Sequence, residues 1–326
     1  MSERKAEPDH LIRVRGLNKS FNGRRVLKDI QLDIPRGKTS CIIGTSGSGK
    51  STLMRLLTGL GSADSGEIIF DGQDIVTLGN HGLELIRRDV GMVFQYSALL
   101  GSMSIFDNIA LPLIEARKFS AELKKLYTDT YIRDRVNDCL RIVRLLGFET
   151  YLPAELSGGM RKRAGMARAI VAKPKVIFYD EPTSGLDPVI SAMIHALIAE
   201  LSQSFGVTNI VITHDLKKSF EIADRVAMIF DGTIVFSGSV TEFEACTHPA
   251  VQQLLTGDLQ GPLTSHETLD NATQFKPSET QKHQIDYIRR QIEKRRRELV
   301  RMDAQQAGII LPVFSPLDKD DDLNDL

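Results

Sequence analysis

The chain carries the stretch Gly44-Thr45-Ser46-Gly47-Ser48-Gly49-Lys50-Ser51-Thr52, whose first eight residues match the pattern G-x-x-x-x-G-K-S. The run Thr39–Ile43 before it predicts a buried strand, and the residues after it predict a helix from Lys50 to about Thr58. Glycines let such a loop wrap closely around phosphate, and its N–H groups favour anionic oxygens. Lys50 can then reach the β- and γ-phosphates of a nucleotide, and Ser51 can ligate Mg²⁺. The alternative is a turn merely rich in glycine and serine, and the flanking strand and helix argue against it.

A second signal is the stretch Val176-Ile177-Phe178-Tyr179-Asp180-Glu181, in which four apolar residues precede two carboxylates. The apolar residues predict a buried strand, so both carboxylates stand at its end. Asp180 is then placed to hold Mg²⁺, and Glu181 to polarise an attacking water. Taken alone, the stretch is also compatible with a strand that ends in a solvated acidic turn. The phosphate loop upstream in the same chain favours the catalytic interpretation.

Strands alternate with helices over most of the chain. Residues 11–36 and 62–76 show the apolar–polar alternation of antiparallel strands, with turns predicted at Ser65-Gly66 and Asp71-Gly72. From about 102 to 155, apolar residues recur at helical spacing, which predicts a helical subdomain inserted into the sheet domain. Further strands are predicted at 176–179, 209–212 and 225–236. The alternation predicts an α/β protein with a mainly parallel sheet.

Composition excludes several other classes of protein. The net charge of the 326 residues is -1, so no global field favours nucleic acid, and we expect no nucleic-acid partner. The three cysteines lie far apart, which argues against a disulfide framework or a zinc site. No run approaches the roughly 20 apolar residues that a membrane span needs. We therefore expect a cytosolic protein whose membrane attachment comes through a partner or a surface.

The stretch Leu156-Ser157-Gly158-Gly159-Met160 resembles the signature motif of the ABC ATPases, in which LSGGQ is usual. It lies about twenty residues before Asp180, as it does in that family. The resemblance implies, over residues 11–256, the fold of a P-loop NTPase of the ABC nucleotide-binding type, with an antiparallel β subdomain and a helical subdomain. It also implies that this loop closes over ATP bound by a second copy of the chain, which makes the functional unit a homodimer.

Other positions match the same family. Phe21 resembles the aromatic residue that stacks on adenine, and Gln95 resembles the glutamine that touches Mg²⁺ and water and senses the membrane partner. The stretch Ser184-Gly185-Leu186-Asp187 resembles the loop that crosses the dimer interface. His214 resembles the histidine that contacts the γ-phosphate.

The resemblance thus implies a full set of site residues with ATP and Mg²⁺ as cofactors. Catalysis is expected from Gln95, Glu181 and His214. Mg²⁺ is expected on Ser51, Gln95 and Asp180. ATP is expected on Phe21, Gly44, Thr45, Ser46, Gly47, Ser48, Gly49, Lys50, Ser51, Thr52, Ser157, Gly158 and Gly159.

A narrower resemblance comes from the run Met160-Arg161-Lys162-Arg163-Ala164-Gly165-Met166-Ala167-Arg168, which replaces the usual glutamine-rich run. Together with the stretch 93–113, it looks like the ATPases of the Mce-associated phospholipid transporters, the Mla type. That resemblance implies an ATPase at the cytoplasmic side of a bacterial inner membrane, bound through a multi-span permease and working with a periplasmic MCE lipid-binding protein. The alternatives are an ABC importer or exporter of another substrate, or a non-transport ABC ATPase of DNA repair or cell division.

The composition changes after residue 256. Residues 257–281 are rich in small and polar types and predict a linker, and 282–326 are expected to form a C-terminal helical extension with an acidic tail. Residues 282–302 hold eight Lys/Arg against three Asp/Glu, whereas 318–326 hold five Asp against one Lys. We expect the basic helix to pack on the second subunit; a helix on an anionic lipid surface and a solvated helix are the alternatives.

Overall fold

The computed structural model describes residues 9–264, apart from the side chain of Lys217. The predicted C-terminal extension and acidic tail, and most of the predicted linker, lie outside the described residues. Residues 257–264 belong to the same compact unit as the residues before them. There the side chain of Gln253 accepts a hydrogen bond from the N–H of Leu263 at 2.7 Å and donates one to the carbonyl of Asp258 at 3.0 Å.

The antiparallel sheet is built from strands that lie close together in the sequence. Its order is β2 (Arg24–Pro35), β1 (His10–Phe21), β4 (Ser65–Phe70) and β5 (Gln73–Asp74). The predicted turn at Asp71-Gly72 is present between β4 and β5, but the predicted turn at Ser65-Gly66 is wrong, because both residues open β4. A Cβ atom at Gly66 would lie 2.4 Å from the carbonyl oxygen of Gly16. The glycine is therefore required by a close approach between strands rather than by a turn.

The second sheet is mainly parallel, as the alternation of strands and helices predicts. Its order is β10 (Thr233–Gly238), β9 (Arg225–Phe230), β3 (Thr39–Ile43), β8 (Thr208–Ile212), β7 (Val176–Asp180) and β6 (Val90–Val93). All pairs are parallel except β9 with β10. The predicted strand at 225–236 is thus a hairpin, which turns at Asp231 and Gly232 with φ of 46° and 75°.

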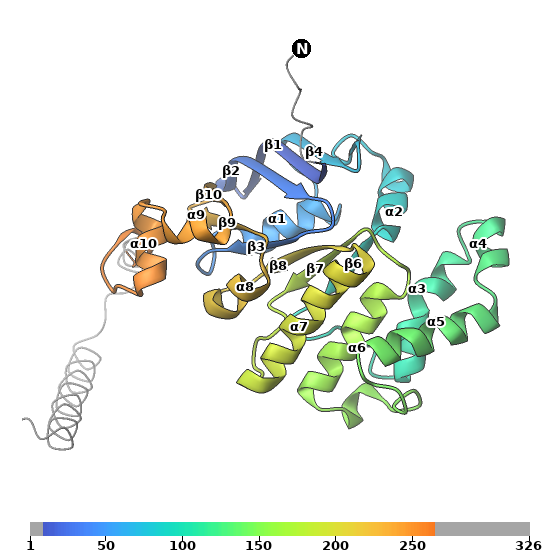
Figure 1. Cartoon of the computed structure of the whole chain (residues 1–326). Helices are drawn as coiled ribbons and strands as arrows, with labels where there is room; N and C mark the ends of the chain where they lie inside the picture. The colour runs from blue at the N-terminus through green and yellow to red at the C-terminus, as the bar shows by residue number, and fades with distance from the viewer. Residues whose placement is uncertain (1–8, 265–326) are drawn as a thin grey trace, which may run out of the picture. The chain divides into compact units, whose positions relative to one another are not determined.

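Helices cover the parallel sheet and form the expected helical subdomain (Figure 1). Around the sheets lie α1 (Lys50–Leu57), α2 (Asn80–Arg88), α6 (Gly158–Ile170), α7 (Pro188–Phe205), α8 (Leu216–Ile222), α9 (Val240–Glu244) and α10 (Pro249–Thr256). The helical subdomain holds α3 (Ile105–Ala116), α4 (Ala121–Leu126), α5 (Asp129–Ile142) and the short 3-10 helix η1 (Pro153–Glu155). In the described residues, no helix is both long and apolar enough to cross a membrane.

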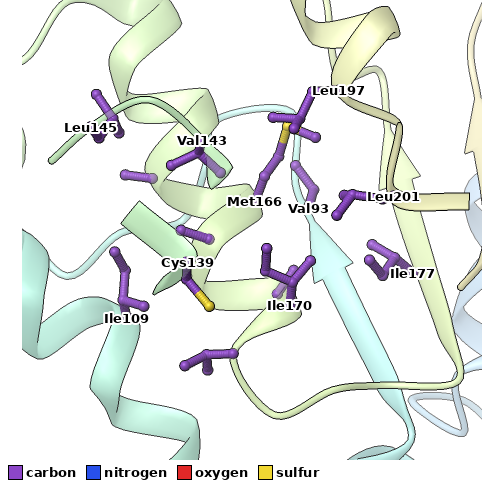
Figure 2. Packing of buried hydrophobic residues seen from close by; sticks show 14 of the residues in the cluster. Val93, Ile109, Cys139, Val143, Leu145, Met166, Ile170, Ile177, Leu197 and Leu201 are labelled. Carbon is purple, nitrogen blue, oxygen red and sulfur yellow. The ribbon is translucent and has the colours of Figure 1, made fainter. Parts of the chain in front are cut away.

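A continuous apolar core joins the helical subdomain to the parallel sheet. Figure 2 shows Ile109 of α3 and Cys139 of α5 on one side of α6, with Val93 of β6 and Ile177 of β7 on the other. Each large side chain buried in this way contributes about 1.5–3 kcal/mol. Burial also raises the pKa of the Cys139 thiol to about 11, so the residue acts as a small apolar group. Helix α6 is therefore the central element of this core.

The contact between α6 and β6 is unusually close at Gly91. A Cβ atom there would lie 2.7 Å from the carbonyl oxygen of Ala169 and 3.2 Å from Cγ1 of Ile177. Gly91→Ala should therefore push α6 away from the sheet and destabilise the fold by about 1–3 kcal/mol, as overpacking of a core does. The measurement is the thermal midpoint of unfolding, which should fall by about 2–4 °C for each kcal/mol lost.

Gly101→Ala is the matched control, because no heavy atom lies within 4 Å of the added carbon. Its unfolding midpoint should stay close to that of the unmodified chain, within the small range typical of surface substitutions. Equal midpoints for the two variants would contradict this account of α6 packing.

Candidate functional site

Four adjacent parallel strands deliver four loops to one edge of the sheet. The strands lie in the order β3, β8, β7 and β6, and their carboxyl ends lead into Gly44, His214, Asp180 and Gln95 respectively. The register keeps these ends level, because Ile212 pairs with Ile42 on one side and with Asp180 on the other. Ligands of open α/β sheets bind at such an edge. The predicted phosphate, metal and water-binding residues are thus brought together.

The phosphate loop runs from β3 into α1 and depends on glycines for its path. A Cβ atom at Gly44 would lie 2.3 Å from the carbonyl oxygen of Ile229, and one at Gly49 would lie 2.8 Å from Leu27. Gly49 also has a φ of 108° and begins α1 as its N-cap. The first N–H groups of α1, which include those of Ser51 and Thr52, have no partners within the helix. They can hold phosphate oxygens, as the sequence predicts.

Lys50 lies across the loop. Its ammonium donates to the carbonyl oxygens of Gly44 at 2.9 Å and Thr45 at 2.7 Å. Burial lowers the pKa of Lys50, and the charges of Glu181 and Asp180 oppose that shift. The ammonium of Lys50 therefore interacts electrostatically with both carboxylates.

The two carboxylates at the end of β7 differ in their surroundings. Burial raises the pKa of Asp180, as does the charge of Glu181, while Lys50, Arg55 and Lys162 act in the opposite direction. Glu181 has a φ of 46°, a left-handed conformation that costs a residue with a side chain about 1 kcal/mol or more. Its N–H donates to the carbonyl of Ile212 at 2.9 Å. Neighbouring strands thus hold Glu181 in a strained position.

His214 contacts Glu181 directly. Its Nδ1 lies 2.8 Å from Oε1 of Glu181, a hydrogen bond that the Nδ1–H tautomer donates to the carboxylate. The side chain of His214 is 73% exposed, whereas that of Glu181 is 17% exposed. The histidine therefore presents its ring to solvent from a fixed position beside the carboxylate.

Gln95 connects this edge with the loop before α7. Its Nε2 donates to Oγ of Ser184 at 3.4 Å, and the N–H of Ser184 donates to the carbonyl of Glu181 at 3.2 Å. Asp187 ends the same loop as the N-cap of α7 and accepts from the N–H groups of Val189 and Ile190. The stretch 184–187, assigned from the sequence to a subunit interface, is thus linked to two of the predicted catalytic residues.

The signature loop lies elsewhere in the chain's fold. Ser157 is the N-cap of α6 and accepts from the N–H of Met160 at 3.3 Å. A Cβ atom at Gly159 would lie 2.6 Å from Cγ2 of Ile190, so this glycine also permits α6 to approach α7. Figure 1 draws α6 among the helices away from the antiparallel sheet, whereas α1 lies next to that sheet. Within one chain, the helix that begins at the signature loop is therefore drawn apart from the helix that begins at the phosphate loop.

Phe21 sits on the antiparallel sheet, at the end of β1. Its side chain is 51% exposed, and the ammonium of Lys19 lies 5.2 Å from the ring centroid. The following strand, β2, contacts the phosphate loop through Leu27 at Gly49. The structure thus leaves the ring accessible for stacking, and its contact with adenine stays a prediction.

One cation that has no assigned role in the sequence analysis also reaches this edge. Lys162 of α6 is buried, with 5% exposure, and its ammonium donates to the carbonyls of Gln95 and Glu181. The sequence gives no local signal for this role, because a lysine within the basic run 161–163 is typical of a solvated helix face.

Comparisons with known proteins agree with this arrangement. The family model described as ABC transporter matches residues 27–184. The chain is 40% identical over 262 residues to the "probable ribonucleotide transport ATP-binding protein mkl" of Mycobacterium leprae, a match that covers 80% of this chain and 73% of that protein. It is 38% identical over 254 residues to the "intermembrane phospholipid transport system ATP-binding protein MlaF" of Escherichia coli K12, which covers 78% of this chain and 91% of that protein.

A solved structure is also similar. The dimeric, post-hydrolysis ATP-binding cassette MJ0796 bound to ADP and Pi has a TM-score of 0.63 and 29% identity, and the match covers 70% of this chain and 98% of that chain. The edge of the parallel sheet, the signature helix and these relatives lead to one conclusion. The chain belongs to the ATP-binding subunits of the ABC transporter family.

Proposed function

We propose that two copies of this chain close over two ATP molecules and that hydrolysis drives a multi-span membrane permease. The observation that carries the proposal is the division of the site between two faces. Gln95, Asp180, Glu181 and His214 gather at the edge of the parallel sheet, while Ser157 begins α6, a helix that Figure 1 draws apart from α1 and its phosphate loop. The similarity to a cassette whose title describes a dimer supports the same arrangement.

The residues present fit Mg²⁺. The site offers a hydroxyl at Ser51, an amide at Gln95 and a carboxylate at Asp180, which are the oxygen ligands that this hard cation prefers. Burial and the charge of Glu181 both raise the pKa of Asp180, so a divalent cation beside this carboxylate is electrostatically favoured. We propose that Ser51, Gln95 and Asp180 hold it with nucleotide phosphates as further ligands. When bound, it would neutralise charge on the phosphates.

The chain's own residues would supply the rest of the chemistry. Phosphoryl transfer to water needs positioning and charge stabilisation more than covalent help. Glu181, held by its contact with His214, would orient the water. Lys50 would stabilise charge on the γ-phosphate, and Ser157 of the second subunit would donate from the opposite side.

Glu181→Gln tests the role of the carboxylate. The amide keeps the shape of the side chain but cannot polarise water as a carboxylate does, so we expect ATP binding to persist, hydrolysis to be nearly abolished and a closed dimer to accumulate. Steady-state phosphate release and light scattering with ATP measure these outcomes. Lys50→Ala is the companion variant and should lose nucleotide affinity in a titration. Turnover of Glu181→Gln near that of the unmodified chain would contradict the assignment.

Ser157→Arg tests whether the signature loop acts on the second subunit. Placed in the Glu181→Gln background, the bulky cation should block closure while leaving the phosphate loop of the same chain intact. We expect ATP binding to be retained and the ATP-dependent dimer to be lost. A dimer that still forms with ATP would argue that Ser157 does not face the partner's nucleotide.

We further propose that the cargo is phospholipid and that an MCE protein completes the system, with this chain at the cytoplasmic side of a bacterial inner membrane, bound through the permease. The run Met160–Arg168 and the 38% identity to MlaF over 91% of its length support this cargo. The 40% identity to mkl supports ribonucleotide as a second candidate.

Purification of the full chain from membranes distinguishes these cargoes. We expect a multi-span permease and an MCE protein to co-purify, with phospholipid in the complex. We expect phospholipid vesicles to stimulate ATP hydrolysis by this complex, and ribonucleotides other than ATP to leave it unchanged. Stimulation by ribonucleotides would favour the second candidate. Purification without any multi-span protein would instead favour a non-transport ABC ATPase.

A further inference from the structure

The signature helix α6 carries a group of cations that point inward. Arg161, Lys162, Arg163 and Arg168 all donate to main-chain carbonyl oxygens. A basic run of this kind on a helix would ordinarily be assigned to a solvated face. Here, Lys162, Arg163 and Arg168 instead bind carbonyls of segments that pack against α6, and Arg161 binds the carbonyl of Leu156, just before the helix.

Lys162 has the contacts that matter most for the candidate site. Its ammonium lies 2.5 Å from the carbonyl oxygen of Gln95 and 3.2 Å from that of Glu181. These two residues follow the neighbouring strands β6 and β7. The side chain of Lys162 thus binds the main chain of both Gln95 and Glu181, whose side chains we propose to contact Mg²⁺ and water.

Two further residues on α6 hold the same segment. Arg168 donates to the carbonyls of Ser97 at 3.0 Å and Ala98 at 2.8 Å, and a Cβ atom at Gly165 would lie 3.4 Å from the carbonyl of Ser97. Positions 162, 165 and 168 follow one another at a spacing of three and lie along one side of the helix. The segment 95–98 is therefore bound along α6, with Lys162 at the end nearest Glu181.

The burial of Lys162 removes a charged group from water, which is unfavourable unless the ammonium forms hydrogen bonds. Burial lowers the pKa of its ammonium, and the charges of Glu181 and Asp180 oppose that shift. An apolar side chain of similar length would fill the same space without desolvating a charge. The methylene stem alone therefore does not account for a lysine here, whereas donation to two carbonyls does.

We propose that Lys162 is a positioning residue for ATP hydrolysis, which holds the main chain of Gln95 and Glu181 in place from the signature helix. This inference rests on the roles proposed above for those two residues. It goes beyond them by linking α6, whose first residues would contact the second subunit's ATP, to the residues that act on this subunit's ATP.

Two variants of the full chain separate the parts of this role. Lys162→Met removes the donors and the charge, and its kcat should fall at least about tenfold while its KM for ATP changes less than about threefold, since the phosphate loop is untouched. Lys162→Gln restores N–H donors without the charge, so its kcat should lie between that of Lys162→Met and that of the unmodified chain. Rates are normalised to the folded fraction measured by circular dichroism.

The split between kcat and KM is a readout that simple loss of packing would not give. A packing defect lowers the folded fraction, for which the rates are corrected, whereas misplaced main chain at Gln95 and Glu181 lowers the rate of each folded molecule. Partial rescue by Lys162→Gln would then assign the effect to the hydrogen bonds with the two carbonyls.

Arg163→Met is the matched control. It also removes an α6 cation that donates to two carbonyls, but these belong to Val143 and Arg144 in the helical subdomain. Its kcat per folded molecule should stay close to that of the unmodified chain. If Lys162→Met keeps the kcat of the unmodified chain while Glu181→Gln is inactive, only the inference about Lys162 is overturned. If Glu181→Gln is itself active, the proposed function fails first.

Discussion

The site depends on the register of four parallel strands. Ile212 of β8 pairs with Ile42 of β3 and with Asp180 of β7, so three strand ends reach the same level before their loops begin. Neighbouring strands lie about 4.8 Å apart, which sets the spacing of the phosphate loop, the histidine and the carboxylates. The hydrogen bond of His214 with Glu181 then joins two of the loops. A slip of one residue would turn Asp180 to the other face of the sheet. The fully buried strands β3 and β8, covered on both faces, oppose such a slip.

The site also depends on the strained backbone conformation of Glu181. Its left-handed backbone is unfavourable for a residue with a side chain, and three groups from different elements hold it there. Its N–H binds the carbonyl of Ile212, its carbonyl accepts from Lys162, and its carboxylate meets His214. The first contact comes from β8, the second from α6, and the third from the loop after β8. The conformation of the proposed catalytic carboxylate is thus fixed by the packing of the whole parallel layer.

The sequence predicts well those features whose physical cause is local. The loop at 44–51 and the pair Asp180-Glu181 are recognisable because a strand, a turn and a helix follow one another within a few residues. Gly66 is misread as a turn because its cause, the carbonyl of Gly16, lies on another strand. The inward direction of Lys162 is equally invisible, since a charged residue in a basic run is typical of a surface until β6 and β7 are placed against the helix.

The resemblance to the Mla-type ATPases depends partly on residues 160–168, and these residues also form most of α6. The run after Gly159 replaces a glutamine-rich stretch by cations. In the structure those cations bind carbonyls of Leu156, of the segment 143–144 and of the segment 95–98. A glutamine could donate to such carbonyls as well, but a lysine at position 162 adds a charge beside Asp180. That charge lowers the pKa of Asp180, the carboxylate that we propose as a ligand of Mg²⁺. The substitution therefore changes the electrostatics around this carboxylate while it keeps the same mechanical link. In the dimer proposed above, this link would make α6 the element that joins closure of the signature loop on one ATP to the alignment of Glu181 at the other.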